Sequence, residues 1–222
     1  MSIREAISQF KRELPHDVSL VAVSKFHSVE AIKEAYESGQ RIFGESRVQE
    51  LLTKQQDLPS DIQWHFIGHL QTNKVKQLIG KVALIESVDS VRLLQLIDAE
   101  SRKREVITNV LMQIHVAQEE TKFGFTPQEL MDYFEHREFE SLTNTHICGV
   151  MGMASNTDNE ERIKADFKTI RNAFDEIKNN KDYGLRGFDI VSMGMSQDYK
   201  LAINEGSTHV RIGSYIFGER QY

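Results

Sequence analysis

Short apolar, β-branched runs alternate along the chain with longer segments in which apolar residues recur at helical spacing. Eight runs are typical of buried strands: Leu20–Ser24, Arg41–Gly44, Gln63–Ile67, Val82–Glu86, Val110–Val116, His146–Met151, Ile190–Met193 and Val210–Gly213. Most are separated by helical patterns, such as the stripe Ile163, Phe167, Ile170, Phe174 and Ile177 and the shorter stripe Leu130, Met131 and Phe134. This alternation predicts an α/β fold with a parallel sheet. Eight strands favour a closed (β/α)8 barrel of the TIM type, although periodicity alone does not decide closure.

Helix starts are also visible in the sequence. Thr126 to Glu129 combines an N-cap, a proline at the first helical position and a capping-box glutamate, and Thr157 to Glu160 repeats the capping-box pattern. Apolar residues at helical spacing predict an amphipathic N-terminal helix over about residues 2–14. No linker-like or low-complexity stretch interrupts the chain, so we expect a single domain over residues 1–222.

Composition restricts the class of protein. The 222 residues include 27 basic and 33 acidic side chains, a formal charge of −6, which gives no bulk attraction for nucleic acid or an anionic membrane. The one cysteine, Cys148, is typical of a reducing compartment, and its apolar neighbours predict a buried thiol. Charges interrupt the N-terminal apolar positions, so we expect no signal peptide and a cytoplasmic protein. Nothing in the sequence requires a dimer, and we expect a monomer.

In such barrels, reactive groups gather where the strands end and the following loops begin. The first strand ends at Ser24 and Lys25, and strand alternation puts Val21, Val23 and Lys25 on one face. If that face points inward, the ammonium loses hydration, its pKa falls, and the neutral amine can attack an aldehyde. If it points outward, Lys25 is a strand-terminal lysine that reaches solvent. The spacing leaves both interpretations open.

The loop after the second strand, Gly44 to Arg47, is a further candidate at the rim. Glu45 within it is a carboxylate that could simply pair with a neighbouring base such as Lys25 or Arg47. Ser46 adds a hydroxyl at the position where the rim and a ligand would meet.

Arg211 places a permanent charge within the eighth strand, on the face shared by His209 and Gly213. Arginine is rarely buried unless it is paired. Its partner is therefore either a structural carboxylate or an acceptor on a ligand.

Two loops rich in glycine and serine follow the last two strands: Gly194-Met195-Ser196 and Gly213-Ser214. These are the loops that frequently hold phosphate in such barrels, because glycine admits a close ligand and the amides at a helix start bind anions. The alternative is ordinary turn chemistry, with Ser196 capping the helix from Gln197 onward.

The segment after the third strand supplies His69 and Asn73, which could hydrogen-bond a ligand ring. His65 is expected to point into the structure. The spacing of His65 and His69 would suit a metal ion only on a helix, and this stretch has the pattern of a strand, so we expect no metal site.

Several of these stretches together resemble the YggS/PROSC family of pyridoxal 5'-phosphate (PLP) homeostasis proteins. The stretches that carry the resemblance are Val21–Lys25, Phe43–Glu45, Arg47–Glu50, Trp64–Gly68, Ser192–Ser196, Glu205–Thr208 and Val210–Gly213, and they extend from about residue 18 to the C-terminus. The resemblance implies a single-domain barrel of PLP fold type III, similar to the N-terminal half of bacterial alanine racemases.

By position, the resemblance implies that Lys25 forms a Schiff base with PLP and that Arg211 faces the pyridine nitrogen. Ser196, Gly213 and Ser214 match phosphate-loop positions, with backbone contacts from Gly194 and Met195. The family usually has Gly-Glu-Asn-Arg where this chain has Ser46 at the third position, so a hydroxyl replaces the amide there.

The resemblance also bears on catalysis. Arginine is always charged and only donates, so it favours an unprotonated ring nitrogen and a weaker electron sink. The racemases carry a second, β-rich domain with an opposing tyrosine, and here the chain ends at Tyr222, shortly after the eighth strand. We therefore expect a non-catalytic PLP carrier that buffers the cofactor or delivers it to apo-enzymes. The alternatives are a small PLP-dependent amino-acid racemase or decarboxylase, and a PLP-free barrel that binds a sugar phosphate.

Overall fold

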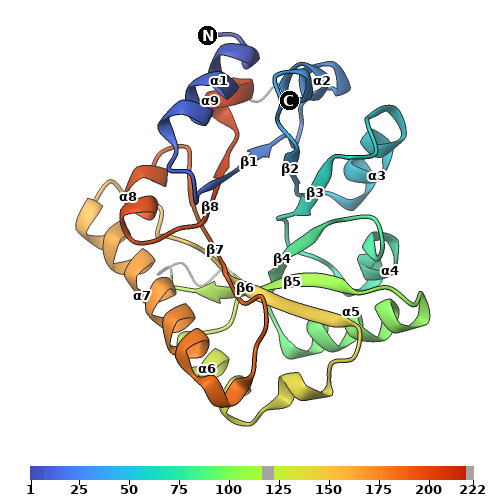
Figure 1. Cartoon of the computed structure of the whole chain (residues 1–222), viewed down its shortest axis with the longest axis vertical. Coiled ribbons are helices and arrows are strands. Elements are labelled where there is room, and N and C mark those ends of the chain that lie inside the picture. Colours follow the sequence, from blue (N-terminus) through green and yellow to red (C-terminus); the bar gives the residue numbers. More distant parts are fainter. Residues whose placement is uncertain (117–122, 219–222) are drawn as a thin grey trace.

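The computed structural model describes residues 1–116 and 123–218. Within them, eight parallel strands close into one barrel in sequence order, and β8 returns to pair with β1 (Figure 1). The strands are β1 (Ser19–Val23), β2 (Ile42–Glu45), β3 (Gln63–Phe66), β4 (Leu84–Val88), β5 (Thr108–His115), β6 (Thr145–Met153), β7 (Ile190–Met195) and β8 (His209–Ile212). The predicted closed barrel is confirmed, and no strand end differs from its predicted position by more than two residues.

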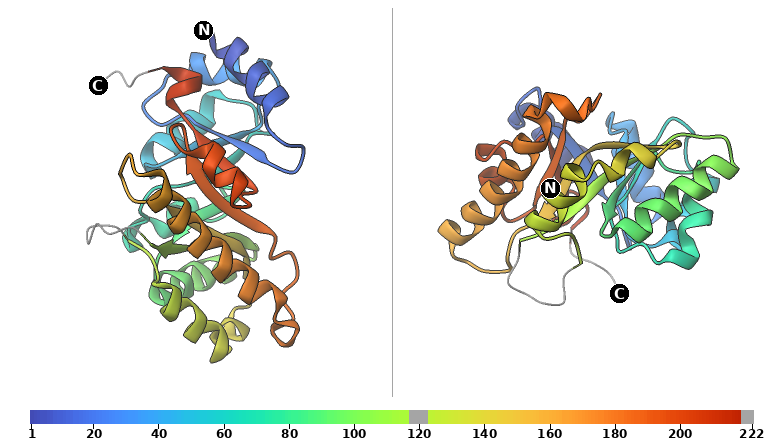
Figure 2. Two further views of the ribbon diagram at one scale, coloured as in Figure 1. Left: turned by 90° about the vertical axis from the view of Figure 1, so that its left-hand side faces the viewer. Right: turned by 90° about the horizontal axis from the view of Figure 1, so that it is seen from below.

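Helices lie outside the strands, as the two perpendicular views of Figure 2 show. They are α1 (Ile3–Glu13), α2 (Val29–Glu37), α3 (Val48–Asp57), α4 (Val75–Leu78), α5 (Val91–Lys103), α6 (Pro127–Glu135), α7 (Glu160–Asn179), α8 (Tyr199–Asn204) and α9 (Ser214–Phe217), with 3-10 turns η1 (Thr72–Lys74), η2 (Glu138–Ser141) and η3 (Lys181–Tyr183). Helix α1 confirms the predicted N-terminal helix, and it packs beside α9. In the part of the chain that the structure describes, no helix combines the length and apolarity needed to cross a membrane.

Two of the predicted helix starts have different outcomes. The Thr126–Glu129 capping box is present at the start of α6. The box predicted for Thr157 and Glu160 is wrong, because α7 begins later and Asn159 is its N-cap, accepting a hydrogen bond from the Arg162 amide. A better N-cap residue two positions downstream displaces the threonine. The predicted stripe of α7, from Ile163 to Ile177, is buried against the barrel.

Inside the barrel lie an apolar cluster and a group of polar side chains, here called the polar layer, which consists of His65, Glu86, Ser192, His209 and Arg211. Leu84, Leu111, Cys148 and Met151 form a small buried cluster. The prediction that Cys148 is buried is confirmed, and burial raises the pKa of its thiol to about 11. Two residues beyond Leu84 along β4, and so on the same face, Glu86 begins the polar layer. Tyr222, the end of the chain, lies outside the described residues.

Candidate functional site

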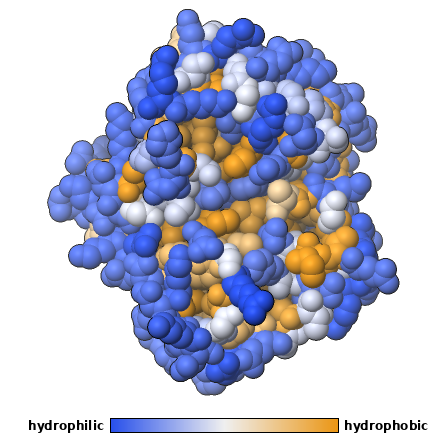
Figure 3. All heavy atoms as spheres, in the orientation of Figure 1, coloured by the Kyte–Doolittle hydropathy of each residue, from blue (hydrophilic) through white to orange (hydrophobic). Residues whose placement is uncertain are grey.

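A cavity of about 640 Å³ opens at the carboxyl ends of the strands, within the size range of small-molecule sites. Seven of the residues singled out in the sequence line it: Lys25, Ser46, Met195, Ser196, Arg211, Gly213 and Ser214. Apolar side chains from β1, β6 and the following helices complete its walls. Figure 3 shows the face seen in Figure 1, where hydrophobic side chains gather across the middle and hydrophilic ones surround them.

Lys25 follows directly on β1, is half-buried and lines the cavity together with Val23. The alternation predicted from the sequence therefore holds, and the inward interpretation replaces that of a lysine directed to solvent. Barrel closure sets its surroundings. Val21 of β1 lies opposite Arg211 of β8, and Val23 lies opposite Gly44 of β2, so the loops after these strands meet around Lys25.

Arg211 is only 5% exposed, and its side chain reaches from β8 into the polar layer. Its Nη1 donates to the carbonyl oxygen of Ser192 (2.8 Å) and to Ser192 Oγ (2.7 Å), and its Nη2 donates to the carbonyl oxygen of Gly152 (2.9 Å). A guanidinium has five N–H donors, so these three bonds leave two for an acceptor in the cavity that Arg211 lines.

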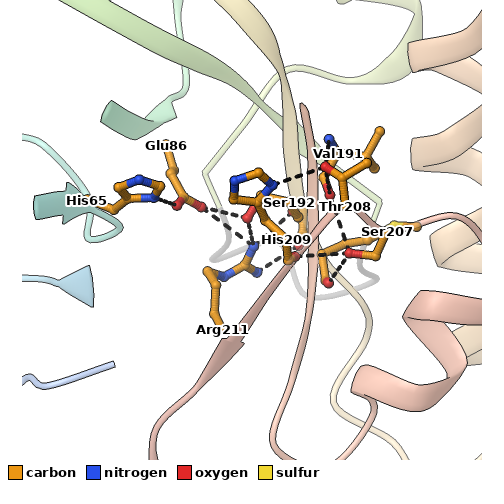
Figure 4. A network of polar contacts seen from close by, with 10 residues as sticks. His65, Glu86, Val191, Ser192, Ser207, Thr208, His209 and Arg211 are labelled. Carbon is orange, nitrogen blue, oxygen red and sulfur yellow. Dashed lines mark hydrogen bonds and ion pairs between the residues drawn. The ribbon is translucent and has the colours of Figure 1, made fainter. Parts of the chain in front are cut away.

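Glu86 provides the carboxylate that the sequence left open as one partner of Arg211 (Figure 4), with Oε2 at 3.9 Å from Arg211 Nη1. It is fully buried, accepts from Ser192 Oγ (2.6 Å) and pairs with His65 Nδ1 (2.6 Å). Burial by itself raises its pKa, but the hydrogen bond and charge of His65, the charge of Arg211 and the Ser192 hydroxyl outweigh burial and lower the pKa to about 2. Arg211 is therefore a paired cation in a fixed position.

Two histidines stand beside this pair. His65 is buried and points into the structure, as predicted. Its ring lies 6.1 Å from that of His209, whose Nδ1 contacts Thr208 Oγ1 at 3.1 Å (Figure 4). Burial lowers the pKa of His209 to about 4 despite the nearby charge of Glu86, so His209 is neutral at pH 7. The ring of His209 therefore adds no positive charge beside Arg211 at pH 7.

The two loops rich in glycine and serine meet. The amide of Gly213 donates to Ser196 Oγ (3.4 Å), which joins the loops after β7 and β8. The alternative role of Ser196, as the cap of a helix from Gln197 onward, is wrong, because α8 begins at Tyr199 and Asp198 is its N-cap residue. Helices α8 and α9 have six and four residues, too short for a large macrodipole. Any anion here is held by individual hydroxyls and amides.

The remaining sequence candidates do not line the cavity. Gly194 is buried in β7 with φ +94, and an added Cβ would lie 2.6 Å from Ala202 Cβ, so close packing on α8 explains this glycine. His69 is exposed, pairs with Asp89 (2.9 Å) and stacks on Phe123 at 3.7 Å between ring centroids. Asn73 is exposed in η1. His69 and Asn73 follow the end of β3, and no sequence pattern indicates the direction of the chain after Phe66.

Sequence reasoning also missed several residues. Glu45 pairs with Lys54 of α3 (2.8 Å) rather than with the predicted Lys25 or Arg47. The loop after β6 contributes Ser155, Asn156, Thr157 and Asp158 to the cavity, and His27 contributes from the loop after β1. The rule that strand-end loops gather at one rim could have found them, because that loop follows β6 directly.

Comparison with known proteins identifies the class first. Residues 1–221 match the family described as alanine racemase, N-terminal domain. A solved alanine racemase of Clostridium difficile 630 superposes with a TM-score of 0.77 at 15% identity, covering 100% of this chain and 57% of that chain. At this identity the likeness shows the fold, a single (β/α)8 barrel.

Closer relatives narrow the class. The pyridoxal phosphate homeostasis protein of Aquifex aeolicus is 41% identical over 204 residues, which cover 91% of this chain and 87% of the relative. PipY of Synechococcus elongatus PCC7942, solved with PLP bound, has a TM-score of 0.89 at 34% identity and covers 98% of this chain and 100% of that chain. The chain belongs to the family of pyridoxal phosphate homeostasis proteins.

Proposed function

We propose that this protein holds PLP in the cavity at the barrel mouth, through a Schiff base on Lys25, and buffers the cofactor or delivers it to other proteins. The observation that carries the proposal is that Lys25, Arg211 and both loops rich in glycine and serine line one cavity. The relative solved with PLP bound supports the same ligand. The lone cysteine favours a cytoplasmic setting.

Lys25 supplies the covalent link. Its amine, once unprotonated, adds to an aldehyde carbon, and a C=N bond forms as one water molecule leaves. Water or a second amine can displace Lys25 from the C=N bond. The link therefore stores the reactive aldehyde and also allows its release. Apolar walls that include Val23 and Met153 border the cavity that the amine enters.

Arg211 fits the ring nitrogen, because two of its donors remain and its position is fixed by Ser192 and Glu86. A permanently charged donor favours an unprotonated acceptor, and an unprotonated ring is the weaker electron sink. The weaker sink supports a protein that holds PLP rather than one that uses it to stabilise carbanions. Bound PLP acts as an electron sink in the enzymes that use it, and here Arg211 beside the ring nitrogen would weaken that sink.

The phosphate is assigned to the two joined loops. Ser196 and Ser214 offer hydroxyls, and the first amides of α9, those of Ser214 and Tyr215, have no partner within a helix. Ser46 offers a third hydroxyl on the opposite side of Lys25, from the loop after β2. His69, Asn73 and Gly194 are not part of this proposed set.

The test is borohydride reduction of the PLP-treated protein, followed by peptide mapping in a mass spectrometer. We expect a single reduced adduct on Lys25, lost in Lys25→Ala, and unchanged in Lys33→Ala, where an exposed lysine of α2 is removed. An adduct on another lysine would overturn the assignment of the site.

Incubation of the same loaded protein with free amino acids tests the carrier role. We expect conversion no faster than with PLP alone, and the release of PLP to a PLP-dependent apo-enzyme. Turnover well above that of free PLP would instead favour a small PLP-dependent racemase or decarboxylase.

A further inference from the structure

Lys54 of α3 is a buried lysine that lies behind the segment carrying Lys25 and does not line the cavity. It is 6% exposed, and its ammonium donates three hydrogen bonds, to the carbonyl oxygen of Ser24 (2.8 Å), to Glu45 Oε1 (2.8 Å) and to Glu50 Oε1 (2.7 Å). An ammonium has three N–H donors, so all of them are used. Burying such a group is costly, so the three groups that it bonds are the reason to examine its role.

The cluster around this ammonium fixes both neighbours of Lys25. On one side, Ser24 accepts through its carbonyl oxygen and donates from Oγ to Glu45 Oε1 at 2.6 Å. On the other side, the amide of Phe26 donates to Glu50 Oε1 at 2.6 Å. The backbone of Lys25 is therefore suspended between two anchored residues beyond the end of β1.

The backbone of Phe26 shows that this segment is held firmly. Its φ of +68 lies in the left-handed region, which is a true outlier for a bulky side chain. Such conformations persist only where the surroundings impose them. The Glu50 carboxylate holds the Phe26 amide, and the Arg47 guanidinium lies 4.7 Å from the centre of the Phe26 ring.

We infer that Lys54 is a positioning residue, which fixes the main chain on both sides of Lys25 through Ser24, Glu45 and Glu50 and so keeps the Lys25 amine directed into the cavity. The inference rests on the proposed function, because it assigns Lys54 a part in holding the cofactor through Lys25. A lysine side chain has a long flexible stem, and a fixed main chain reduces the freedom that the amine loses when it bonds. Lys54 touches no ligand itself.

The test compares Lys54→Met with Lys33→Met, which removes an exposed lysine of α2. We expect PLP to leave the loaded Lys54→Met protein about tenfold faster, equal to about 1.4 kcal/mol. Lys33→Met should leave the rate unchanged. Binding of pyridoxamine 5'-phosphate, whose amine replaces the aldehyde, should be the same in all three proteins, because it cannot bond to Lys25. Equal weakening of both ligands would show that Lys54 only supports the fold and would overturn the inference.

A second measurement needs no ligand. Amide hydrogen exchange at Phe26 should be slow in the original protein and about tenfold faster in Lys54→Met. That factor corresponds to a loss of about 1.4 kcal/mol in the free energy of local opening. If Lys54→Met does not fold, Glu50→Gln takes its place, because it removes the charge that holds Lys54 and its neutral oxygen accepts more weakly from the Phe26 amide. Unchanged exchange in the folded variants would contradict the inference.

The two proposals fail separately. If the original protein forms no adduct on Lys25, the proposed function fails, and the exchange at Phe26 still decides whether Lys54 fixes the main chain. If the adduct forms on Lys25 but PLP leaves Lys54→Met and Glu50→Gln at the original rate, only the positioning role is lost.

Discussion

At the scale of single residues, two glycines with positive φ separate the cost of a backbone conformation from the cost of crowding. Gly194 in β7 has φ +94 and faces Ala202 Cβ at 2.6 Å from an added Cβ, whereas Gly80 has φ +74 and nothing within 4 Å of an added Cβ. Both positions disfavour an L side chain, and only one of them also lacks the space for it.

We expect Gly80→Ala to lower the free energy of unfolding by about 1–2 kcal/mol, the cost of a left-handed conformation. Gly194→Ala should lose about 1–3 kcal/mol more, because the methyl group overpacks the contact between β7 and α8. Urea unfolding of the two variants measures the difference. Equal losses would mean that α8 moves to accommodate the methyl group without loss of stability, and the crowding argument would be wrong.

Sequence reasoning at this scale succeeded where a residue stands at a strand end. Alternation along a strand singled out Lys25 and Arg211 as candidates but left both interpretations of each open, and the family resemblance favoured the functional one. Lys54 was missed, because in the sequence it reads as one more lysine of an amphipathic helix, and its burial depends on the packing of α3 against β2. His69 was expected at the site, but the chain after a strand has no period that would fix its direction.

At the scale of the element, the strands were predictable because a barrel strand is buried on both faces and appears as a short, continuous apolar run. The interior polar layer was not, because Glu86 and Ser192 come from strands that are 106 residues apart in the chain. Their contact follows from closure of the barrel, and no local sequence pattern predicts which distant strands closure brings together.

Strand β8 makes the protein sensitive to acid through His209. The pKa of this histidine is about 4 in the fold, against an ordinary value near 6.5, so below pH 6.5 the unfolded chain takes up a proton that the folded chain refuses. Stability therefore falls as the pH decreases from about 6.5 to about 4. The contribution has an upper limit of about 3 kcal/mol, since one pKa unit corresponds to about 1.4 kcal/mol.

Urea unfolding at several pH values between 7 and 4.5 should show this decrease, and His209→Gln should flatten it. His16→Gln, which removes an exposed histidine, is the matched control and should keep the original slope. Glu86 does not obscure the result, because its pKa of about 2 places its own loss of stabilising charge between its ordinary value of 4.5 and about 2. A His209→Gln slope equal to that of the original protein would contradict the assignment.

At the scale of the whole molecule, the cavity draws residues from β1, β6, β7 and β8 and from the loops after β1, β2, β3, β6, β7 and β8, so a ligand there should stabilise the barrel as a unit. PLP at about 100 times its dissociation constant should add about 2.7 kcal/mol. For a chain of this size that raises Tm by about 5–10 °C.

Thermal unfolding with PLP and with pyridoxal, which has the aldehyde but no phosphate, separates the two parts of the site. At equal concentration, pyridoxal should raise Tm by less than half as much, because the hydroxyls and amides of Ser196 and Ser214 then have no anion to bind. Equal rises would mean that the loops after β7 and β8 contribute nothing to binding.

The pairing of β1 with β8 has a consequence for the growing chain on the ribosome. The strand that presents Lys25 is made before its neighbour that carries Arg211, so the two halves of the cavity meet only after β8 has been made. Until that moment the nascent sheet keeps two open edges, which can pair with other chains. A ligand that needs both halves of the cavity therefore cannot bind before β8 is made, and a chain that stops short of β8 has no complete site for it.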